Sequence, residues 1–116
     1  MDADEMEAKM KRLRMYVPTH TAKQYVEAEN LLRALSHAYV GFTRYAAEGV
    51  WFSKAWNKAM TERVVVVEVL TDDPRDAVRA LRQYGEQAKE ETVLWTVEDV
   101  EAHFETVAAR DEKEVA

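Results

Sequence analysis

The stretch that decides the fold is Arg63-Val-Val-Val-Val-Glu-Val-Leu-Thr-Asp-Asp73, which runs directly into Pro74. Four consecutive valines and two further apolar residues around the lone Glu68 are too few for a core helix and too apolar for a loop. Such a run is typical of a strand that is buried on both faces at the centre of a sheet. The sequence therefore predicts a central strand around which the rest of the chain is arranged.

Length, charge and cysteine content limit the class of protein. The chain has 116 residues, enough for one domain with its own core, and no cysteine for disulfides, zinc sites or thiol nucleophiles. A formal net charge of −6 argues against general binding to duplex DNA or to an anionic membrane. The acidic beginning and the lack of a long apolar run predict an unexported, cytoplasmic protein, located in the host cytoplasm if a phage encodes it.

The first part of the chain predicts a strand and a helix. Residues 1–12 carry mixed charge with methionines at helical spacing, and indicate a flexible or loosely helical arm. Alternating apolar residues over 13–17 predict a strand that Pro18 ends. A capping-box pattern at Thr21 then starts an amphipathic helix that Gly41 stops.

The remainder predicts further strands and two more helices. Residues 42–60 indicate extended segments within a hairpin arm or a loop rich in Trp and Lys. The Asp-Pro pair after the valine strand is typical of a helix start, and alternation over 92–97 predicts a last strand. A capping-box pattern then predicts an added C-terminal helix over 96–107, and residues 111–116 form a solvated tail.

The predicted order is strand, helix, strand, strand, helix, strand. Right-handed crossovers place the first and the valine-rich strands side by side in the middle of an antiparallel sheet, with both helices on one face. The sequence therefore predicts an α+β, ferredoxin-like βαββαβ domain over residues 13–110, with the added C-terminal helix.

The other face of the sheet is where function is expected. If Val65, Val67 and Val69 face the helices, the apolar face opposite them needs a cover. A second copy of the sheet or the terminal helix could supply it, and a cavity between the layers could hold a small ligand. A plain dimer interface or second core is the simpler explanation. The residues expected on this open face are Tyr16, Val64, Val66, Glu68, Leu70 and Leu94.

Residues 42–63 interleave basic and aromatic side chains. This mixture suits stacking of a planar base while a guanidinium or ammonium group holds a phosphate. The same composition also fits packed tryptophans with solvated lysines around them. With three residues from elsewhere, the segment supplies the candidate ligand-binding residues, which are Tyr16, His20, Arg44, Tyr45, Trp51, Lys54, Trp56, Lys58 and Glu68.

His20 and Glu68 are the candidates with acid–base potential. His20 stands at a helix N-terminus, a place that attracts anions. Glu68 lies inside the valine strand, where a carboxylate costs free energy unless it is paired. It forms either a cross-strand pair with Arg14 or Tyr16, or a proton acceptor or ligand contact in a pocket. The histidines lack metal-ligand spacing and the three glycines are scattered, so no catalytic residue, metal or cofactor is predicted.

The pattern Val17-Pro18, Gly41-Phe42-Thr43, Gly49-Val50-Trp51 and Glu62 resembles a group of small uncharacterised bacterial and phage α+β proteins. The resemblance covers roughly residues 13–97 and implies a small α+β domain, often encoded on mobile DNA. It assigns no catalytic residues. Residues 54–59 depart from the group, because a Gly-containing turn is expected at that place.

These observations favour a non-enzymatic binding protein that forms a homodimer or higher homo-oligomer. It would capture a small anionic or nucleotide-like ligand, for example to sequester an immune signal in an anti-defence role. The first alternative is a small ferredoxin-like enzyme with a pocket on the open sheet face. The second alternative is a protein–protein inhibitor or adaptor, which would require a large partner.

Overall fold

The computed structural model describes residues 5–108, with the side chains of 9–108. The predicted tail over 111–116 and the first four residues of the predicted arm lie outside the described residues. Six elements follow one another in the order βαββαβ. They are β1 (Glu5–Pro18), α1 (Ala22–Ala38), β2 (Thr43–Ser53), β3 (Lys58–Thr71), α2 (Arg75–Ala88) and β4 (Leu94–Glu105).

The four strands form one antiparallel sheet with the order β2-β3-β1-β4. The valine-rich strand β3 lies between β2 and β1, so its predicted central position is confirmed. Each ladder keeps a constant register along its length, which fixes the face of every residue by simple alternation. The predicted ferredoxin-like α+β arrangement is confirmed in this coarse form.

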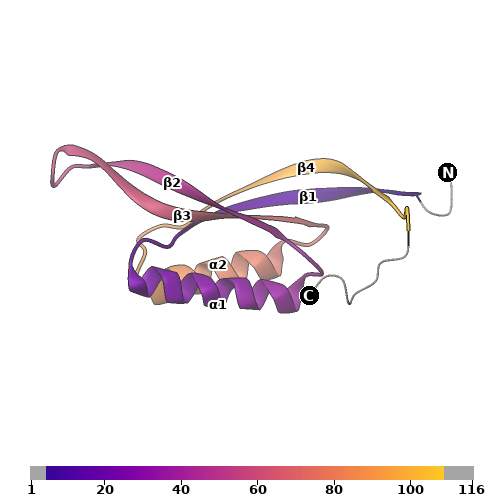
Figure 1. Cartoon of the computed structure of the whole chain (residues 1–116), viewed down its shortest axis with the longest axis horizontal. Helices are drawn as coiled ribbons and strands as arrows, with labels where there is room; N and C mark the ends of the chain where they lie inside the picture. The colour runs from indigo at the N-terminus through magenta and orange to yellow at the C-terminus, as the bar shows by residue number, and fades with distance from the viewer. Residues whose placement is uncertain (1–4, 109–116) are drawn as a thin grey trace.

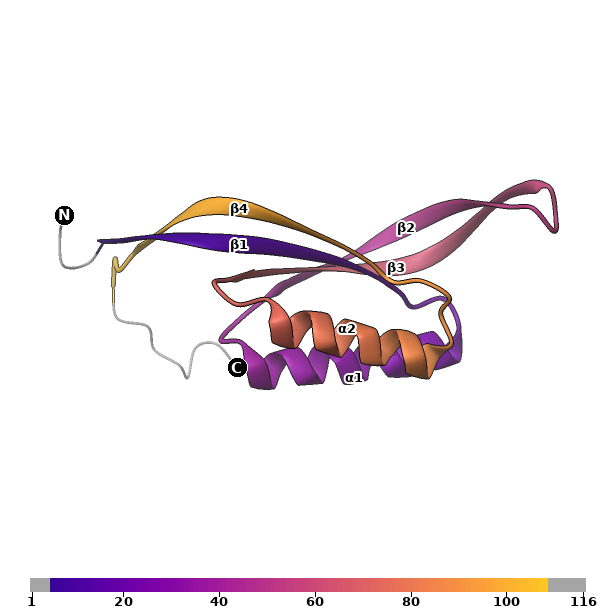
Figure 2. The same ribbon diagram turned by 180° about the vertical axis from the view of Figure 1, so that it is seen from behind.

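Both helices cover the same face of the sheet, as Figures 1 and 2 show from opposite sides. The predicted capping box opens α1, because the Gln24 amide donates to Thr21 Oγ1 at 3.1 Å and the Thr21 amide donates to Gln24 Oε1 at 2.9 Å. In α2, Pro74 occupies the N-cap position and the Asp73 carboxylate accepts from the Arg75 amide at 3.1 Å. Within the part of the chain that is described, neither helix is long and apolar enough to cross a membrane.

The core lies between the helices and the sheet. Val67 and Val69 are fully buried in it and Val65 packs against it, so the predicted helix-facing valines are confirmed. Burial of this many aliphatic side chains supplies the main stabilising free energy of the domain. The other fully or nearly buried core residues are Leu13, Met15, Val17, Ala28, Leu31, Leu32, Leu35, Ala77, Leu81 and Tyr84.

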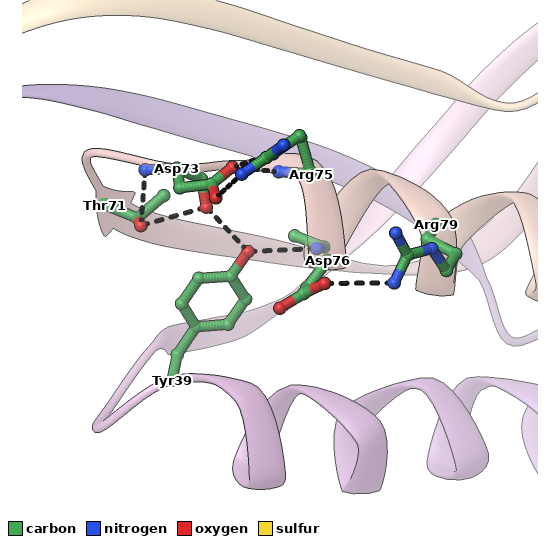
Figure 3. A network of polar contacts seen from close by, with 7 residues as sticks. Tyr39, Thr71, Asp73, Arg75, Asp76 and Arg79 are labelled. Atoms are coloured by element: carbon green, nitrogen blue, oxygen red, sulfur yellow. Dashed lines mark hydrogen bonds and ion pairs between the residues drawn. The ribbon is translucent and has the colours of Figure 1, made fainter.

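A polar network joins the end of α1 to the start of α2 (Figure 3). The Tyr39 hydroxyl donates to the carbonyl oxygen of Asp73 at 3.0 Å and accepts from the Ala77 amide at 3.0 Å. The Thr71 hydroxyl donates to the same Asp73 carbonyl and accepts from the Asp73 amide. These bonds satisfy backbone groups at the turn before α2, where a helix start leaves donors unpaired.

The sheet is longer than the helices that cover it. In Figure 1 the β2–β3 hairpin projects beyond the helices at one end, and β1 with β4 projects beyond them at the other. β2 is one continuous strand, so the hairpin reading of residues 42–60 holds and the loop reading does not. The turn of the hairpin contains Asn57 in a left-handed conformation with φ 51°.

Two predictions at the ends of the chain are wrong. Residues 96–107 do not form an added C-terminal helix, because β4 runs to Glu105 paired with β1, and residues 5–12 are strand rather than arm or helix. The helical reading of both segments has one cause. Apolar residues four apart, such as Val100 and Phe104, lie on one side of a helix, but they also lie on one face of a strand, because four is an even multiple of the strand period.

Candidate ligand-binding site

The open face of the sheet carries one apolar row that crosses all four strands. Tyr45, Val66, Tyr16 and Leu94 stand opposite one another in the registers of the three ladders. Val66 is only 3% exposed although neither helix covers this face, because its tyrosine neighbours flank it on both sides. Leu94 is 57% exposed. The predicted apolar open face is therefore present, and it is bare in the single chain.

A pocket of about 710 Å³ lies where this face meets the loop between α2 and β4. We call it the sheet-end pocket. Its apolar lining includes Tyr16 and Val66 from the sheet and Trp51 from the hairpin, and its polar lining comes from the hairpin, the loop and Gln24 of α1. A volume of this size falls in the range of small-molecule sites, which combine apolar walls with a few polar groups. The residues that line it are Tyr16, Pro18, Gln24, Ala47, Glu48, Gly49, Val50, Trp51, Glu62, Val64, Val66, Lys89, Glu90, Glu91, Thr92 and Leu94.

The polar lining of the sheet-end pocket is mainly acidic. Burial raises the pKa of the Glu62 carboxyl above its ordinary value, the nearby Glu90 carboxylate raises it further, and His20 opposes the shift. Glu90 accepts a hydrogen bond of 2.7 Å from the Gln24 side-chain amide. The two carboxylates come from β3 and from the loop after α2, so tertiary packing alone makes them neighbours.

The loop that carries Glu90 is held by its backbone. Lys89 adopts the left-handed conformation with φ 61° and ψ 38° as the C-cap of α2, and both its amide and that of Glu90 donate to the carbonyl of Gly85. A non-glycine residue in this conformation carries a small backbone strain. The cap turns the chain sharply from α2 toward β4, and it places the acidic pair Glu90-Glu91 at the pocket.

Tyr84 of α2 is hydrogen-bonded to a residue that lines the pocket. Its buried hydroxyl donates to the carbonyl oxygen of Pro18 at 2.6 Å, and Pro18 itself lines the pocket. Burial raises the pKa of the Tyr84 phenol, and the charges of Glu90 and Glu62 add to the shift. The phenol therefore stays protonated and keeps its role as a donor.

A second polar feature of the open face surrounds Glu68. Arg14 Nε donates to Glu68 Oε1 at 2.7 Å across the β1–β3 ladder, and the Tyr45 hydroxyl donates to the same oxygen at 3.3 Å. The bond from Arg14 lowers the pKa of the Glu68 carboxyl, and the bond to Glu68 raises the pKa of the Arg14 guanidinium. Glu68 is thus held as a paired carboxylate, which is the cross-strand alternative for this residue.

The structure separates the predicted ligand-binding residues into groups. Tyr16 and Trp51 line the sheet-end pocket, whereas Tyr45 and Glu68 belong to the neighbouring Arg14 network. Arg44 lies 3.7 Å from Glu29 of α1. The last group consists of Lys54, Trp56 and Lys58, which lie at or beside the hairpin turn and are not among the residues that line this pocket.

His20 is held close to the sheet-end pocket without lining it. Its Nδ1 accepts from the Arg63 amide at 3.3 Å, and the neighbouring Thr19 amide donates to the Arg63 carbonyl at 2.9 Å. Sequence reasoning missed Glu62, Glu90 and Lys89 as pocket residues. The signal for Glu62 was its position in β3, because residues two apart in a strand lie on the same face, and Glu62 therefore shares the open face with Val64 and Val66. No local sequence pattern linked Glu62 to the loop after α2.

Comparison with known proteins shows the fold. No protein-family model matches the chain, and no curated protein matches it. The structure of B. subtilis GlnK in complex with ATP is similar with a TM-score of 0.61 and 12% identity, over 82% of this chain and 84% of that chain.

Two further structures share the arrangement of elements. A phage SAM lyase in complex with S-methyl-5'-thioadenosine is similar with a TM-score of 0.57 and 12% identity, over 87% of this chain and 93% of that chain. The nitrogen regulatory PII-like protein CPII from Thiomonas intermedia K12, bound to ADP, AMP and bicarbonate, has a TM-score of 0.53 and 16% identity, over 84% and 96%. These similarities show the fold, which is that of a small α+β, ferredoxin-like domain.

Proposed function

We propose that this chain is a small-molecule-binding protein that holds an adenosine-containing ligand in the sheet-end pocket and assembles as a homo-oligomer. The observation that carries the proposal is the position of the pocket, on a bare apolar sheet face and between aromatic walls. A pocket there can bury a planar ring against Tyr16 and Trp51 and leave polar groups for orientation.

The apolar surface beside the pocket supports self-association. Large side chains remain exposed along the open face and its hairpin, and monomeric proteins seldom leave a contiguous apolar face bare. A second copy of the same sheet offers a cover with matching chemistry. The residues concerned are Tyr45, Trp51, Leu70, Leu94 and Phe104. In this proposal the second copy also closes the open side of the pocket.

The choice of an adenosine scaffold comes from the fold comparisons. The similar structures hold ATP, S-methyl-5'-thioadenosine, or ADP and AMP, and each of these ligands contains adenosine. Sequestration of a nucleotide immune signal by a phage-encoded protein is one form of the same proposal. Such signals are anionic, and the acidic lining of the pocket weighs against them.

The test is isothermal titration of the folded protein with adenosine, adenine nucleotides and cyclic nucleotides. Trp51→Leu is expected to weaken binding by about tenfold, because stacking on an aromatic side chain contributes on the order of 1–3 kcal/mol per base. Trp56→Leu is the matched control, since Trp56 lies in the hairpin turn and is 72% exposed. Absence of heat across the panel, or equal weakening by both variants, argues against the proposal.

Acid–base catalysis in the same pocket is the second candidate function. The observation that favours it is Glu62, a partly buried carboxyl with a raised pKa beside a cavity, as acid–base groups often are. Glu68 and His20, the sequence-predicted acid–base residues, do not line that cavity. Turnover of a bound nucleoside, followed by mass spectrometry and abolished in Glu62→Gln, would establish an enzyme. Recovery of the nucleoside unchanged would leave the binding function.

A further inference from the structure

The charges around the sheet-end pocket are unequal. The residues that line it include four carboxylates and a single ammonium group, that of Lys89, and Glu48 among them stands opposite Arg63 in the β2–β3 ladder. The acidic residues come from three separate segments, and they are Glu48, Glu62, Glu90 and Glu91. A cleft lined by one sign of charge raises the local concentration of ligands of the opposite sign.

Elsewhere on the sheet, three carboxylates are paired with cations across strands. Asp99 accepts from Lys11 at 2.5 Å, and Glu98 accepts from Arg12 at 2.6 Å. Glu68 is paired with a cation in the same manner. These pairs leave little net charge where they stand, so the sheet itself does not generate a general acidic field.

Glu62 differs from these residues because its cross-strand neighbour is Gly49. Within the described residues, the Glu62 carboxylate has no cross-strand ion pair, although the charge of His20 acts on it. Glycine at position 49 lets the β3 side chains pack closely against β2, since a Cβ there would stand 3.0 Å from Val64 Cγ2 and 3.5 Å from Glu62 Cγ. The position therefore places at the pocket a carboxylate that stands opposite a glycine rather than opposite a cation.

The surrounding groups are suited to a cation as well. Glu90 Oε1 accepts from the Gln24 side-chain amide, and the Tyr84 side chain also interacts with the Glu90 carboxylate. Tyr16 and Trp51 line the same cavity, and aromatic faces attract cations. Lys89 is exposed, and water screens an exposed ammonium group more strongly than a half-buried one. The cavity and its aromatic walls make the ligand site, and the carboxylates set the charge that it accepts.

We propose that the sheet-end pocket selects a nucleoside that carries a positive group, an ammonium or a sulfonium, positioned between Glu62 and Glu90, and that it rejects nucleoside phosphates. This inference rests on the proposed binding function and assigns a charge class to its ligand. A phosphate between Glu62 and Glu90 would lie close to both carboxylates, and Lys89 is the single Lys or Arg among the residues that line the pocket.

The experiment compares three probes on one scaffold by isothermal titration at pH 7 and low salt. The probes are 5'-amino-5'-deoxyadenosine, adenosine and AMP, which place an ammonium, a hydroxyl and a phosphate at the same atom. The amine is expected to bind at least about tenfold more tightly than AMP, with adenosine between them. Added salt is expected to reduce this difference in affinity between the amine and AMP, because it screens the charges.

Substitutions test whether the preference for the amine over AMP arises in the sheet-end pocket. Glu62→Gln is expected to reduce the ratio of the affinity for the amine to the affinity for AMP by about tenfold. The affinity for adenosine should change little. Glu90→Gln provides a second test at a separate position if the first variant does not fold. Asp72→Asn is the control, because it removes one negative charge beside the far end of β3, outside the pocket.

The outcomes separate the two proposals. AMP binding as tightly as the amine overturns the charge inference and leaves the binding function standing. Absence of binding by all three probes overturns both proposals together. A ratio that changes equally in Glu62→Gln and Asp72→Asn also overturns the inference, because the preference would then reflect the net charge of the protein.

Discussion

The buried hydroxyl of Tyr84 donates a 2.6 Å hydrogen bond to the carbonyl oxygen of Pro18, and so fastens α2 to the end of β1. Tyr84 is among the large side chains that are buried completely in the core. The acceptor, Pro18, is the last residue of β1 and also lines the sheet-end pocket. Core packing and the shape of the pocket therefore depend on the same side chain.

Replacement of Tyr84 by Phe is expected to lower the free energy of unfolding by about 1–2 kcal/mol, because the Pro18 carbonyl loses its donor in a buried place. Urea unfolding measures the change. Tyr25→Phe is the control, since Tyr25 is largely exposed on α1 and should shift stability by no more than a few tenths of a kcal/mol. Equal stability of the two variants would show that water replaces the missing donor.

Gly85 lies in α2 where the helix passes closest to the chain before β4. A Cβ at Gly85 would stand 2.7 Å from Val93 Cγ1, too close for two carbon atoms. Ala is the better helix former by about 1 kcal/mol, but crowding in a packed region costs about 1–3 kcal/mol. Gly85→Ala is therefore expected to be net destabilising in thermal unfolding.

Gly41 provides the matched control for that substitution. A Cβ there would meet nothing within 4 Å, and its backbone does not adopt a positive φ. Gly41→Ala should therefore leave the melting temperature unchanged or slightly higher. A stabilised Gly85→Ala variant would mean that the Val93 side chain moves aside at little cost.

Sequence reasoning succeeded where the decisive interactions are local or periodic. The valine run of β3 could only be a buried strand, and alternation then assigned Val66 and Val67 to opposite faces without any tertiary information. The capping box of α1 involves residues three apart, so the pattern at Thr21 contained the whole interaction.

It failed where different periods coincide or where packing joins distant segments. The four-residue spacing of Val100 and Phe104 fits both a helix and a strand, and long-range pairing with β1 decides between them. Glu62 and Glu90 become neighbours only after α2 packs beneath the sheet. The binding role that composition suggests for the basic and aromatic residues near Trp56 stays a prediction, and these residues lie at the hairpin turn, outside the lining of the sheet-end pocket.

Charge on the open face is expected to separate the proposed oligomer into folded monomers. Leu94→Lys places an ammonium on a side chain that is 57% exposed in the single chain, and burial of that charge against a second copy is unfavourable. Native mass spectrometry and circular dichroism together report assembly and folding. Val26→Lys is the control, because Val26 is similarly exposed, at 53%, but lies on α1. A monomeric native protein, or an oligomer that survives Leu94→Lys, contradicts the proposed interface.

The raised pKa of Glu62 predicts a pH dependence of stability. The folded carboxyl holds its proton above the ordinary pKa of 4.5, so the folded protein binds more protons than the unfolded chain in the interval between the two pKa values. The free energy of unfolding should therefore fall as the pH rises through that interval. Because Glu62 is partly exposed, solvent screening keeps this effect small.

Urea unfolding of wild type and Glu62→Gln from about pH 4 to about pH 8 checks this dependence. The variant cannot lose a proton at this position, so its stability relative to wild type is expected to increase with pH. Asp72→Asn should show no such trend across the same interval. A constant difference between wild type and Glu62→Gln would mean that the carboxyl is solvated as in the unfolded chain.

The pairing of Arg14 with Glu68 predicts strong coupling between these positions. Their 2.7 Å contact lies beside Val66 and is partly shielded from water, so removal of one partner leaves the other charge without its counter-ion. Arg14→Leu is therefore expected to lower the urea midpoint more than the double replacement of Arg14 and Glu68 by Leu, which leaves no charge behind. The single variant should also lose stability as the pH rises from about 4 to about 7, because Glu68 must then ionise without the guanidinium that now lowers its pKa. A double-mutant cycle in which the two replacements add independently would show that water, rather than Arg14, stabilises the Glu68 carboxylate.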